Sequence, residues 1–363
     1  MAEPNLDELN TGTRKEIMPS VADNFFKSGP IIRYMRENRM KVFPGGTLIQ
    51  ENFLFRPMKG DFYQKGAQFD VTKRQTKTGM TFTVKKAYVN VTEYLEDVEI
   101  ELRAEHAVFD QVRVDMANAA LTLSAILEIA AMKHGQDLSG SAGANRVAAF
   151  NGFPEALNDG TNAAYDGSLF ANYGGQARAD VNRALTPPLG AITSPNVGGP
   201  INNHVLEMSY QSCVIGEEHP KLGITTSRCV GFINENYAPL QRLVDTVDPV
   251  IGWPGLKFKQ STIVESQYMP GADGINDADI GDFSTPQGTG PAGETFLWMN
   301  PGGEGDDAYV RLHIAASEKF QFGFTGFKVG RDDTMVAGQV LFGGNLIIRT
   351  PRLMRLLHGI RAA

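Results

Sequence analysis

Two different periods of hydrophobic and polar positions follow one another in the first third of the chain. After the turn residues 43–46, residues 47–58 are rich in β-branched and aromatic side chains, which predicts a strand. A second strand begins at Met80, and its alternation slips at Lys85-Lys86 before it resumes, as at a β-bulge. The apolar positions of that strand are Met80, Phe82, Val84, Ala87, Val89 and Val91. We therefore predict a long hairpin over residues 46–92 with a loose tip between residues 60 and 79.

Helical spacing begins after residue 100. Between Glu101 and His134 apolar residues recur every three and four positions, and Gly135 supplies a stop. These positions are Phe109, Val112, Met116, Ala119, Leu123, Ile126, Leu127 and Ala130. A helix of ~30 residues would be about 45 Å long, which exceeds the width of a compact domain. We expect it to form the backbone of the subunit.

The other segments are less regular. Residues 1–45 predict an arm with one short helix, Ala22 to Arg39, which Gly29-Pro30 interrupts. Residues 136–200 are rich in Gly, Ala, Asn and Pro and predict long loops that carry contacts. A mixed α/β section follows, and we predict a helix at 202–211 and strands at 228–233, 257–265, 310–315, 320–324 and 339–350.

Charge is divided into blocks of opposite sign. Residues 27–86 contain 13 Lys and Arg against four Asp and Glu, although the whole chain has a net charge of −7. Residues 93–110 contain seven acids against Arg103 alone, and residues 269–310 contain eight acids and no Lys or Arg. Such blocks are either solvated faces or complementary surfaces that meet head to tail.

Composition describes an ordinary globular protein. With 363 residues, 42% hydrophobic and 21% charged, the chain can form two domains or one elaborated domain. No apolar run approaches the ~20 residues that span a bilayer, and the N-terminus lacks the pattern of a signal peptide, so we expect a soluble protein with no membrane partner. Cys213 and Cys229 are the only cysteines, and we expect both to be reduced and buried.

Signatures of common enzymes are missing from the sequence. The dipeptide Gly-Lys of a P-loop never occurs, and no His is followed by Glu as in His-Glu-x-x-His zinc proteases. Neither Gly-x-Ser-x-Gly nor Cys-x-x-Cys is present. We therefore predict no catalytic residue, no resident metal and no cofactor.

Two weak metal-capable groupings remain. His204, Cys213, His219 and Cys229 have irregular spacings that match no paired zinc pattern. Four aspartates, Asp273, Asp277, Asp279 and Asp282, could hold a divalent cation, but without a bidentate Glu at the right distance a solvated acidic loop is favoured. A soluble metal-dependent hydrolase that uses these aspartates stays open as an alternative.

Several runs together resemble one branch of a known family. They are Phe25 to Tyr34, Pro44 to Phe53, Phe69 to Gly79, Asn90 to Asp97, Val214 to Gly223, Phe324 to Phe327 and Gly330 to Asp333. With the order arm, basic hairpin, long helix, mixed α/β section and returning strand, they resemble the major capsid proteins of tailed bacteriophages, which share the Hong Kong 97 coat fold. The resemblance covers nearly the whole chain and implies an α+β protein.

The resemblance implies the following domains. Residues 1–45 would be the N-terminal arm, 46–92 the extended loop over an adjacent subunit, and 93–135 with 336–363 the peripheral domain, whose spine helix is 103–134. Residues 201–335 would form most of the axial domain, and 136–200 stay without a firm assignment.

The implied function is a major capsid protein that forms hexamers and pentamers in the icosahedral head shell around double-stranded DNA. Scaffolding, portal and decoration proteins would be its partners in the bacterial cytoplasm, and the virion head its final location. The net charge of −7 disfavours tight DNA binding, as suits a container. An encapsulin-type nanocompartment is the alternative inside the fold, and a minor decoration or tail-tube protein is disfavoured by the long helix.

Basic side chains are the candidates for inter-subunit contacts. They are Lys59, Lys65, Lys73, Arg74 and Lys77 on the hairpin and Arg33 and Arg36 on the arm. Some family members join subunits by Lys to Asn isopeptide bonds, but no partner Asn and catalytic Glu match by motif, so we do not expect that chemistry. The short arm also lacks the long scaffolding segment of some members, which predicts a separate scaffolding protein.

Overall fold

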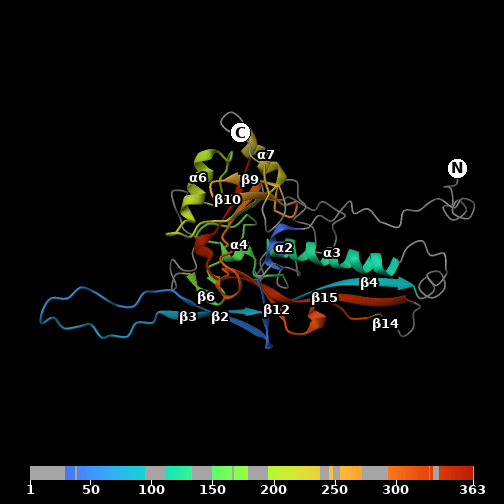
Figure 1. Cartoon of the computed structure of the whole chain (residues 1–363), viewed down its shortest axis with the longest axis horizontal. Helices are drawn as coiled ribbons and strands as arrows, with labels where there is room; N and C mark the ends of the chain where they lie inside the picture. The colour runs from blue at the N-terminus through green and yellow to red at the C-terminus, as the bar shows by residue number, and fades with distance from the viewer. Residues whose placement is uncertain are drawn as a thin grey trace, which may run out of the picture.

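A computed structural model describes most of the chain. The described residues are 29–36, 39–94, 111–132, 149–165, 167–178, 195–237, 245–247, 254–271, 293–326, 328–329 and 335–362. Helices and strands are both present, as the sequence predicts. Most strands form two six-stranded sheets, and a hairpin projects from one end of the molecule (Figure 1). Within the described residues, no helix is both long and apolar enough to cross a membrane.

The first sheet is organised by β15, the longest strand. Its strands are β1 (Met40–Phe43), β12 (Val310–Ala315), β13 (Gln321–Phe324), β14 (Lys328–Val329), β4 (Lys85–Tyr94) and β15 (Met335–Ile348). β15 pairs antiparallel with β4, β12, β13 and β14, and β1 adds to β12 in parallel. Because β12 and β13 pair here, residues 310–324 belong to this sheet and not to the one formed by residues 222–265.

The second sheet has the order β16-β11-β7-β10-β9-β8. Its strands are β7 (Leu222–Thr225), β8 (Asp245–Val247), β9 (Pro254–Phe258), β10 (Ser261–Glu265), β11 (Glu294–Met299) and β16 (Arg355–Ile360). Two helices supply the rest of its core, α6 (Asn203–Ser212) and α7 (Ser227–Tyr237), with Trp298 at the centre. The C-terminal strand β16 therefore lies in this sheet, while β15, just before it, lies in the first.

The hairpin consists of β2 (Leu48–Leu54) and β3 (Lys77–Thr83). Met80 and Phe82 are buried on one side, as predicted. The predicted β-bulge at Lys85-Lys86 is wrong: after Val84 the strand continues as β4 and changes partner from β2 to β15. The apolar alternation slips because the chain passes from the hairpin into the first sheet. There the opposite set of alternate residues faces the core.

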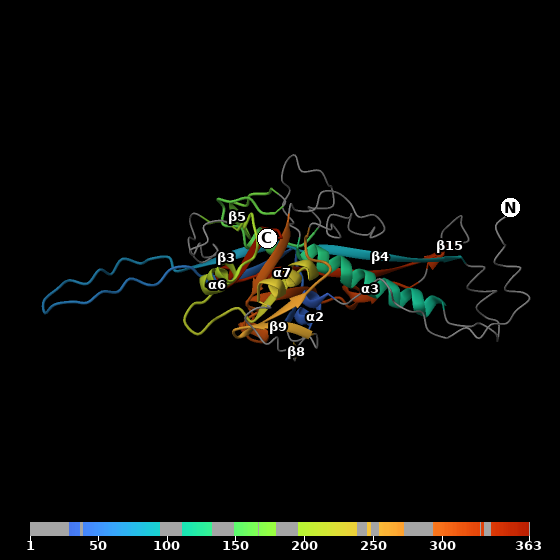
Figure 2. The ribbon, with the colours of Figure 1, turned by 90° about the horizontal axis from the view of Figure 1, so that it is seen from above.

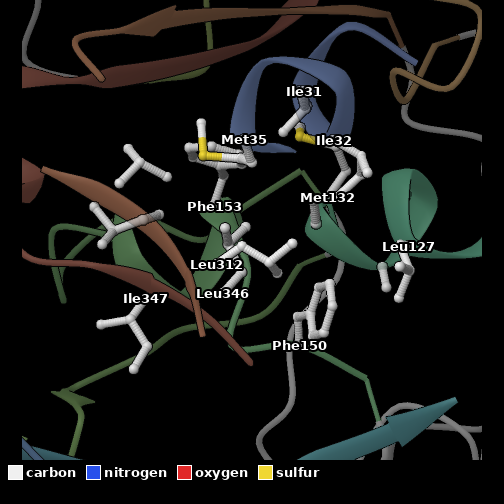
Figure 3. Packing of buried hydrophobic residues seen from close by; sticks show 14 of the residues in the cluster. Ile31, Ile32, Met35, Leu127, Met132, Phe150, Phe153, Leu312, Leu346 and Ile347 are labelled. Carbon is white, nitrogen blue, oxygen red and sulfur yellow. The ribbon is translucent and has the colours of Figure 1, made fainter. Parts of the chain in front are cut away.

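Two helices connect the arm to this sheet. α3 (Gln111–Ala131) packs along β4, and α2 (Pro30–Arg36) packs against α3 and β12. Figure 2 shows α3 running beside the first sheet. Ile31, Ile32 and Met35 of α2, Leu127 of α3 and Met132 just after it belong to one buried cluster, which Figure 3 shows from close by. The predicted helices at 22–39 and 101–134 are confirmed over α2 and α3. Arg39 and Met132 are not helical, and residues 22–28, 37–38, 101–110 and 133–134 lie outside the described residues.

Two predictions for the α/β section are wrong. Residues 228–233 are helical in α7, because Thr226 Oγ1 accepts the Cys229 N–H at 3.2 Å as a cap and the buried Cys229 and Ile233 are four residues apart. Residues 257–265 are two strands, since β9 and β10 form a hairpin that turns at Lys259, whose φ is 52°. In both cases a short apolar run does not distinguish helix, strand and hairpin.

The remaining elements are short. In the described part of the chain they are α4 (Phe153–Ala156), β5 (Asn172–Tyr173), β6 (Gln176–Ala177) and the 3-10 helices η3 (Gly305–Asp307), η4 (Glu318–Phe320) and η5 (Pro351–Leu353). The part of 136–200 that the structure describes contains α4 and the small β5–β6 hairpin, in keeping with the predicted loop-rich character.

Candidate assembly interface

Beyond the β2–β3 ladder the hairpin continues as residues 55–76, which we call the finger. Five large apolar side chains of the finger, Met58, Phe62, Tyr63, Phe69 and Val71, are between 67% and 103% exposed. Burying one such side chain is worth about 1.5–3 kcal/mol, so a finger without a partner forgoes a large stabilisation. A group of large exposed apolar side chains on one segment is typical of an interaction surface.

Two contacts brace the finger across its two arms. The rings of Tyr63 and Phe69 meet edge to face with centroids 5.0 Å apart. Lys59 forms an ion pair with Asp70 and donates a hydrogen bond to Thr72 Oγ1 at 2.6 Å. Hydrogen bonds from Lys59 and Thr72 lower the pKa of Asp70 to about 2. The finger therefore has internal order although it has no core.

The predicted contact residues fall into two groups. Lys59, Lys65, Lys73, Arg74 and Lys77 are exposed on or beside the finger. Arg33 and Arg36 lie on α2, and Arg36 packs its guanidinium 5.1 Å from the centre of the Phe322 ring. The structure thus places the five hairpin cations along one projecting segment and the two arm cations on α2. Their role in contacts between subunits stays a prediction.

The root of the hairpin is fixed to the first sheet by buried charges around Glu51. Glu51 Oε1 lies 3.3 Å from Arg311 Nη1 and 3.2 Å from His313 Nε2, and Oε2 lies 3.4 Å from Arg349 Nε. Arg311 and His313 alternate with apolar residues on β12, and so point to the side of that sheet that Glu51 faces. Both are 2% exposed. This cluster ties β2, from which the finger extends, to the first sheet.

Asp306 extends the cluster toward the surface. Its carboxylate lies 3.5 Å from Arg311 Nη2 and 3.1 Å from Lys41 Nζ, and its backbone carbonyl accepts from Arg349 Nη1 at 2.9 Å. Burial raises the pKa of Glu51, but the hydrogen bond from His313 and the charges of His313, Arg311 and Arg349 outweigh it and lower the pKa to about 2. Glu51 is therefore an anion at neutral pH and compensates the cations around it.

A second support for the root comes from the β5–β6 hairpin. Gly174 O accepts the Thr81 N–H at 2.9 Å, and the Gln176 side chain donates to Gly79 O at 2.8 Å. Gly174 has φ 56°, and a Cβ there would lie 2.7 Å from the Met80 Cβ. Only glycine allows the two chains to approach so closely. Residues 172–177, whose role the sequence does not reveal, hold the outer edge of β3.

The arm is attached to the spine helix by a buried carboxylate. Glu128 of α3 is fully buried and accepts the backbone N–H groups of Ile31 and Ile32 at 2.9 and 2.7 Å. Burial raises the pKa of Glu128 to about 7, against the lowering effect of the two hydrogen bonds. Gly29 is part of the same contact, since a Cβ there would lie 2.3 Å from the Glu128 Cδ.

The metal-capable residues do not form a site among the described residues. No three His, Cys, Asp or Glu side chains converge in that part of the chain. Cys213 and Cys229 are buried thiols, and burial raises the pKa of each to about 12. The aspartates Asp273, Asp277, Asp279 and Asp282 lie outside the described residues, so the hydrolase alternative stays a hypothesis.

Comparisons with known proteins separate sequence from fold. Neither protein-family models nor curated proteins match the sequence. Among solved structures, the chain is similar to a cyanophage A-1(L) capsid protein with a TM-score of 0.58 at 12% identity, covering 97% of this chain and 99% of that one. A capsid protein of the native GTA particle has a TM-score of 0.57 at 9% identity, covering 99% of this chain and 100% of that one.

A third similar structure is a shell of another kind. The holo-SrpI encapsulin complex from Synechococcus elongatus PCC 7942 has a TM-score of 0.57 at 8% identity, covering 99% of this chain and 96% of that one. All three alignments span almost the entire chain, arm, hairpin and both sheets included. The chain has the Hong Kong 97-type capsid fold. The similar structures include both capsid proteins and an encapsulin. The fold that the sequence resemblance predicts is therefore confirmed.

Sequence reasoning missed the buried charges on this fold. Glu51 lies between Ile49 and Phe53 on the inward side of β2, and Glu128 lies among the buried apolar residues of α3. A charge at an inward position of a period-2 or period-3.6 pattern is the signal that could have revealed them, because such a group requires a partner when buried.

Proposed function

We propose that the chain is the major capsid protein of a tailed bacteriophage and assembles as hexamers and pentamers into an icosahedral head shell. The observation that carries this proposal is the finger: five large apolar side chains stand exposed on an internally braced hairpin whose root is ion-paired to the body. A hairpin with no core of its own requires a neighbouring surface. The fold, shared with capsid shells, makes another copy of the chain the natural source of that surface.

The parts of the fold have corresponding roles in this proposal. Residues 46–84 provide the extended loop in place of the predicted 46–92, because residues 85–92 pair with β15. The first sheet with α3 provides the peripheral domain. The second sheet, together with α6 and α7, provides the axial domain around the symmetry axes. In this division residues 310–324 go with the peripheral domain and β16 with the axial domain, because strand pairing assigns them so.

The partners follow from the same role. The chain would bind itself, a separate scaffolding protein, a portal protein and a decoration protein, and would enclose double-stranded DNA without sequence-specific contacts. Assembly would take place in the bacterial cytoplasm, and the mature protein would reside in the head shell. A net charge of −7 supports a container that does not grip its contents.

An encapsulin-type nanocompartment is the second candidate. The similarity to the holo-SrpI encapsulin complex, at a TM-score equal to that for the GTA capsid, favours it. An encapsulin would enclose a protein cargo and no genome. The two candidates therefore differ in what lies inside the shell and not in the fold.

Electron microscopy of the purified protein tests both candidates. The chain is expressed alone and together with the genes that adjoin its own. The particles are imaged by negative stain, and their ultraviolet absorbance shows whether they contain nucleic acid. Closed angular shells with nucleic acid support the capsid protein, and closed shells with protein cargo support the nanocompartment. Small oligomers under all conditions would contradict both.

A further inference from the structure

A groove lies at the root of the finger, and we propose that it receives the acidic segment 95–110 of a second copy of the chain. This inference rests on the proposed function and specifies one of its contacts. We call the hollow the root groove. It has a volume of about 870 Å³, which suits several residues of an extended segment.

Residues from separate parts of the chain form the root groove. The hairpin contributes Asn52, Phe53, Leu54, Phe55, Pro57 and Lys77, and the loop after α6 contributes Ile215 and Glu218. Tyr309 comes from just before β12, Arg349 and Thr350 from just after β15, and Arg352 and Leu353 from η5. Most of the lining is apolar, and Leu54 is 68% exposed. An exposed apolar groove between structured elements is the usual form of a peptide-binding surface.

The charge around the root groove is positive. Lys77 and Arg352 line it, together with Arg349, whose guanidinium is already paired with Glu51. Arg56 lies beside it with its guanidinium 5.2 Å from the centre of the Phe55 ring. Glu218 is the one acid of the lining, and it already accepts a hydrogen bond from Asn300 at 2.9 Å. The groove therefore selects an occupant that combines acidic and apolar side chains. A finger from another copy, which is itself basic, is disfavoured by like charge.

Segment 95–110 has this composition. It holds six Asp and Glu and one Arg, and from Asp97 to Leu102 acidic and apolar residues alternate. Residues 1–28 hold five acids against three basic residues, so their net charge is much weaker. Residues 272–292 hold four acids but only Ile275, Ile280 and Phe283 as large apolar residues. Of the acidic stretches outside the described residues, 95–110 best matches both the apolar lining of the groove and the positive charge around it.

The segment must come from another copy because of distance. It joins the end of β4 to the start of α3, and both lie at the opposite end of the molecule from the finger (Figure 1). The ten residues of β4 span about 33 Å, and the groove lies farther still, beyond β3. Sixteen residues anchored at both ends reach at most about 28 Å from their anchors. The contact is therefore head to tail between copies, the heterologous geometry from which closed rings are built.

Disulfide trapping tests the contact. A variant with Leu54→Cys and Val98→Cys is assembled, oxidised and run on a non-reducing gel; the native Cys213 and Cys229 are buried and supply little background. We expect a ladder of covalent oligomers. Matched variants that combine Leu54→Cys with Val21→Cys or with Ile275→Cys should stay monomeric on the gel. A ladder from either of these, or none from the Val98 variant in shells that form, overturns the inference.

A charge exchange gives independent evidence. Arg352→Glu should lower the yield of shells about tenfold or more, because it places like charges at a contact that every pair of neighbouring copies makes, and Asp97→Arg in the same chain should restore most of the yield. Loss without any rescue contradicts the pairing. If the unaltered chain forms no shells at all, the proposed function fails; if shells form but trapping and rescue both fail, only this contact is refuted.

Discussion

Glu51 on β2 and Arg311 on β12 are 260 positions apart in the chain, yet their carboxylate and guanidinium lie 3.3 Å from each other in the interior. This pair joins the hairpin to the first sheet. The Nε of Arg311 has no hydrogen-bond partner among the described residues, so Glu51 is central to compensating the buried charge of Arg311.

Replacing Glu51 by Ala should destabilise the subunit strongly. Removal of one partner from a buried ion pair leaves uncompensated charge and costs about 3–5 kcal/mol. Urea unfolding of unassembled subunits measures the effect. Glu304→Ala is the matched control, because Glu304 is exposed and its loss should change the free energy of unfolding by less than about 0.5 kcal/mol. Equal effects of the two substitutions would refute a special role for Glu51.

Acid should act on the same residue. The pKa of Glu51 is lowered from 4.5 to about 2, so its contribution to stability is complete above about pH 4.5 and is lost as the pH falls toward 2. We expect the difference in unfolding free energy between the unaltered chain and Glu51→Gln to shrink over this window. Denaturant titrations at pH 2.5, 3.5 and 5 measure it, in the range where the unperturbed carboxyl pKa of about 4.3 lies. A difference independent of pH would contradict the assignment.

Gly29→Ala should weaken the attachment of the arm. The new Cβ would lie 2.3 Å from the Glu128 Cδ, a contact that the buried side chain can relieve only by moving. Overpacking of this kind costs about 1–3 kcal/mol. Gly60→Ala serves as the control, since a Cβ there meets nothing within 4 Å. Thermal unfolding of both variants shows whether the penalty is confined to position 29.

Glu128 should give the opposite pH dependence from Glu51. Its pKa is raised from 4.5 to about 7, so the folded state holds the proton more tightly than the unfolded one. The contribution to stability is then complete below pH 4.5 and is lost as the pH rises through 7. Glu128→Gln should lack this decline, so its stability relative to the unaltered chain should improve from pH 5 to pH 8, a range that spans the shifted pKa. Parallel melting curves across that range would contradict the prediction.

Reversing Lys73 and Arg74 to Glu should impair assembly and spare folding. Both side chains are exposed on the finger, where a surface charge contributes ~1 kcal/mol or less to subunit stability but acts directly on encounter between copies. Circular dichroism checks the fold, and electron microscopy checks the shells. Arg33→Glu with Arg36→Glu provides a comparison on the other group of predicted contacts. Normal shell yield from the finger variant would mean that its charges are not used.

Much of this fold follows from local pattern. The Met80 and Phe82 alternation, the apolar stripe of α3 and the helix α6 are confirmed because each buries one face over many residues, and periodicity reports this directly. The helix α7 and the β9–β10 hairpin were mispredicted, since a cap at Thr226 and a turn at Lys259 decide between states that share one apolar pattern.

Partners distant in sequence are the part that pattern cannot supply. Nothing local to Glu51 indicates Arg311, and nothing local to Gly29 indicates Glu128, because both pairs meet only when the first sheet has formed. The same holds for the change of sheet at Val84, which the sequence shows only as a slipped alternation. The basic residues of the finger could be predicted from the sequence. The buried charges around Glu51 that attach the hairpin to the first sheet could not.

The continuity of β3 and β4 has a mechanical consequence. A neighbour that pulls on the finger along its length pulls on β4 in shear, because the ten residue pairs of the β4–β15 ladder stand across the direction of the force. In that arrangement the hydrogen bonds share the load together and do not open one after another. The tension then passes through β15 into β16 and the second sheet, so a pressurised shell of such subunits would distribute strain across both sheets of every copy.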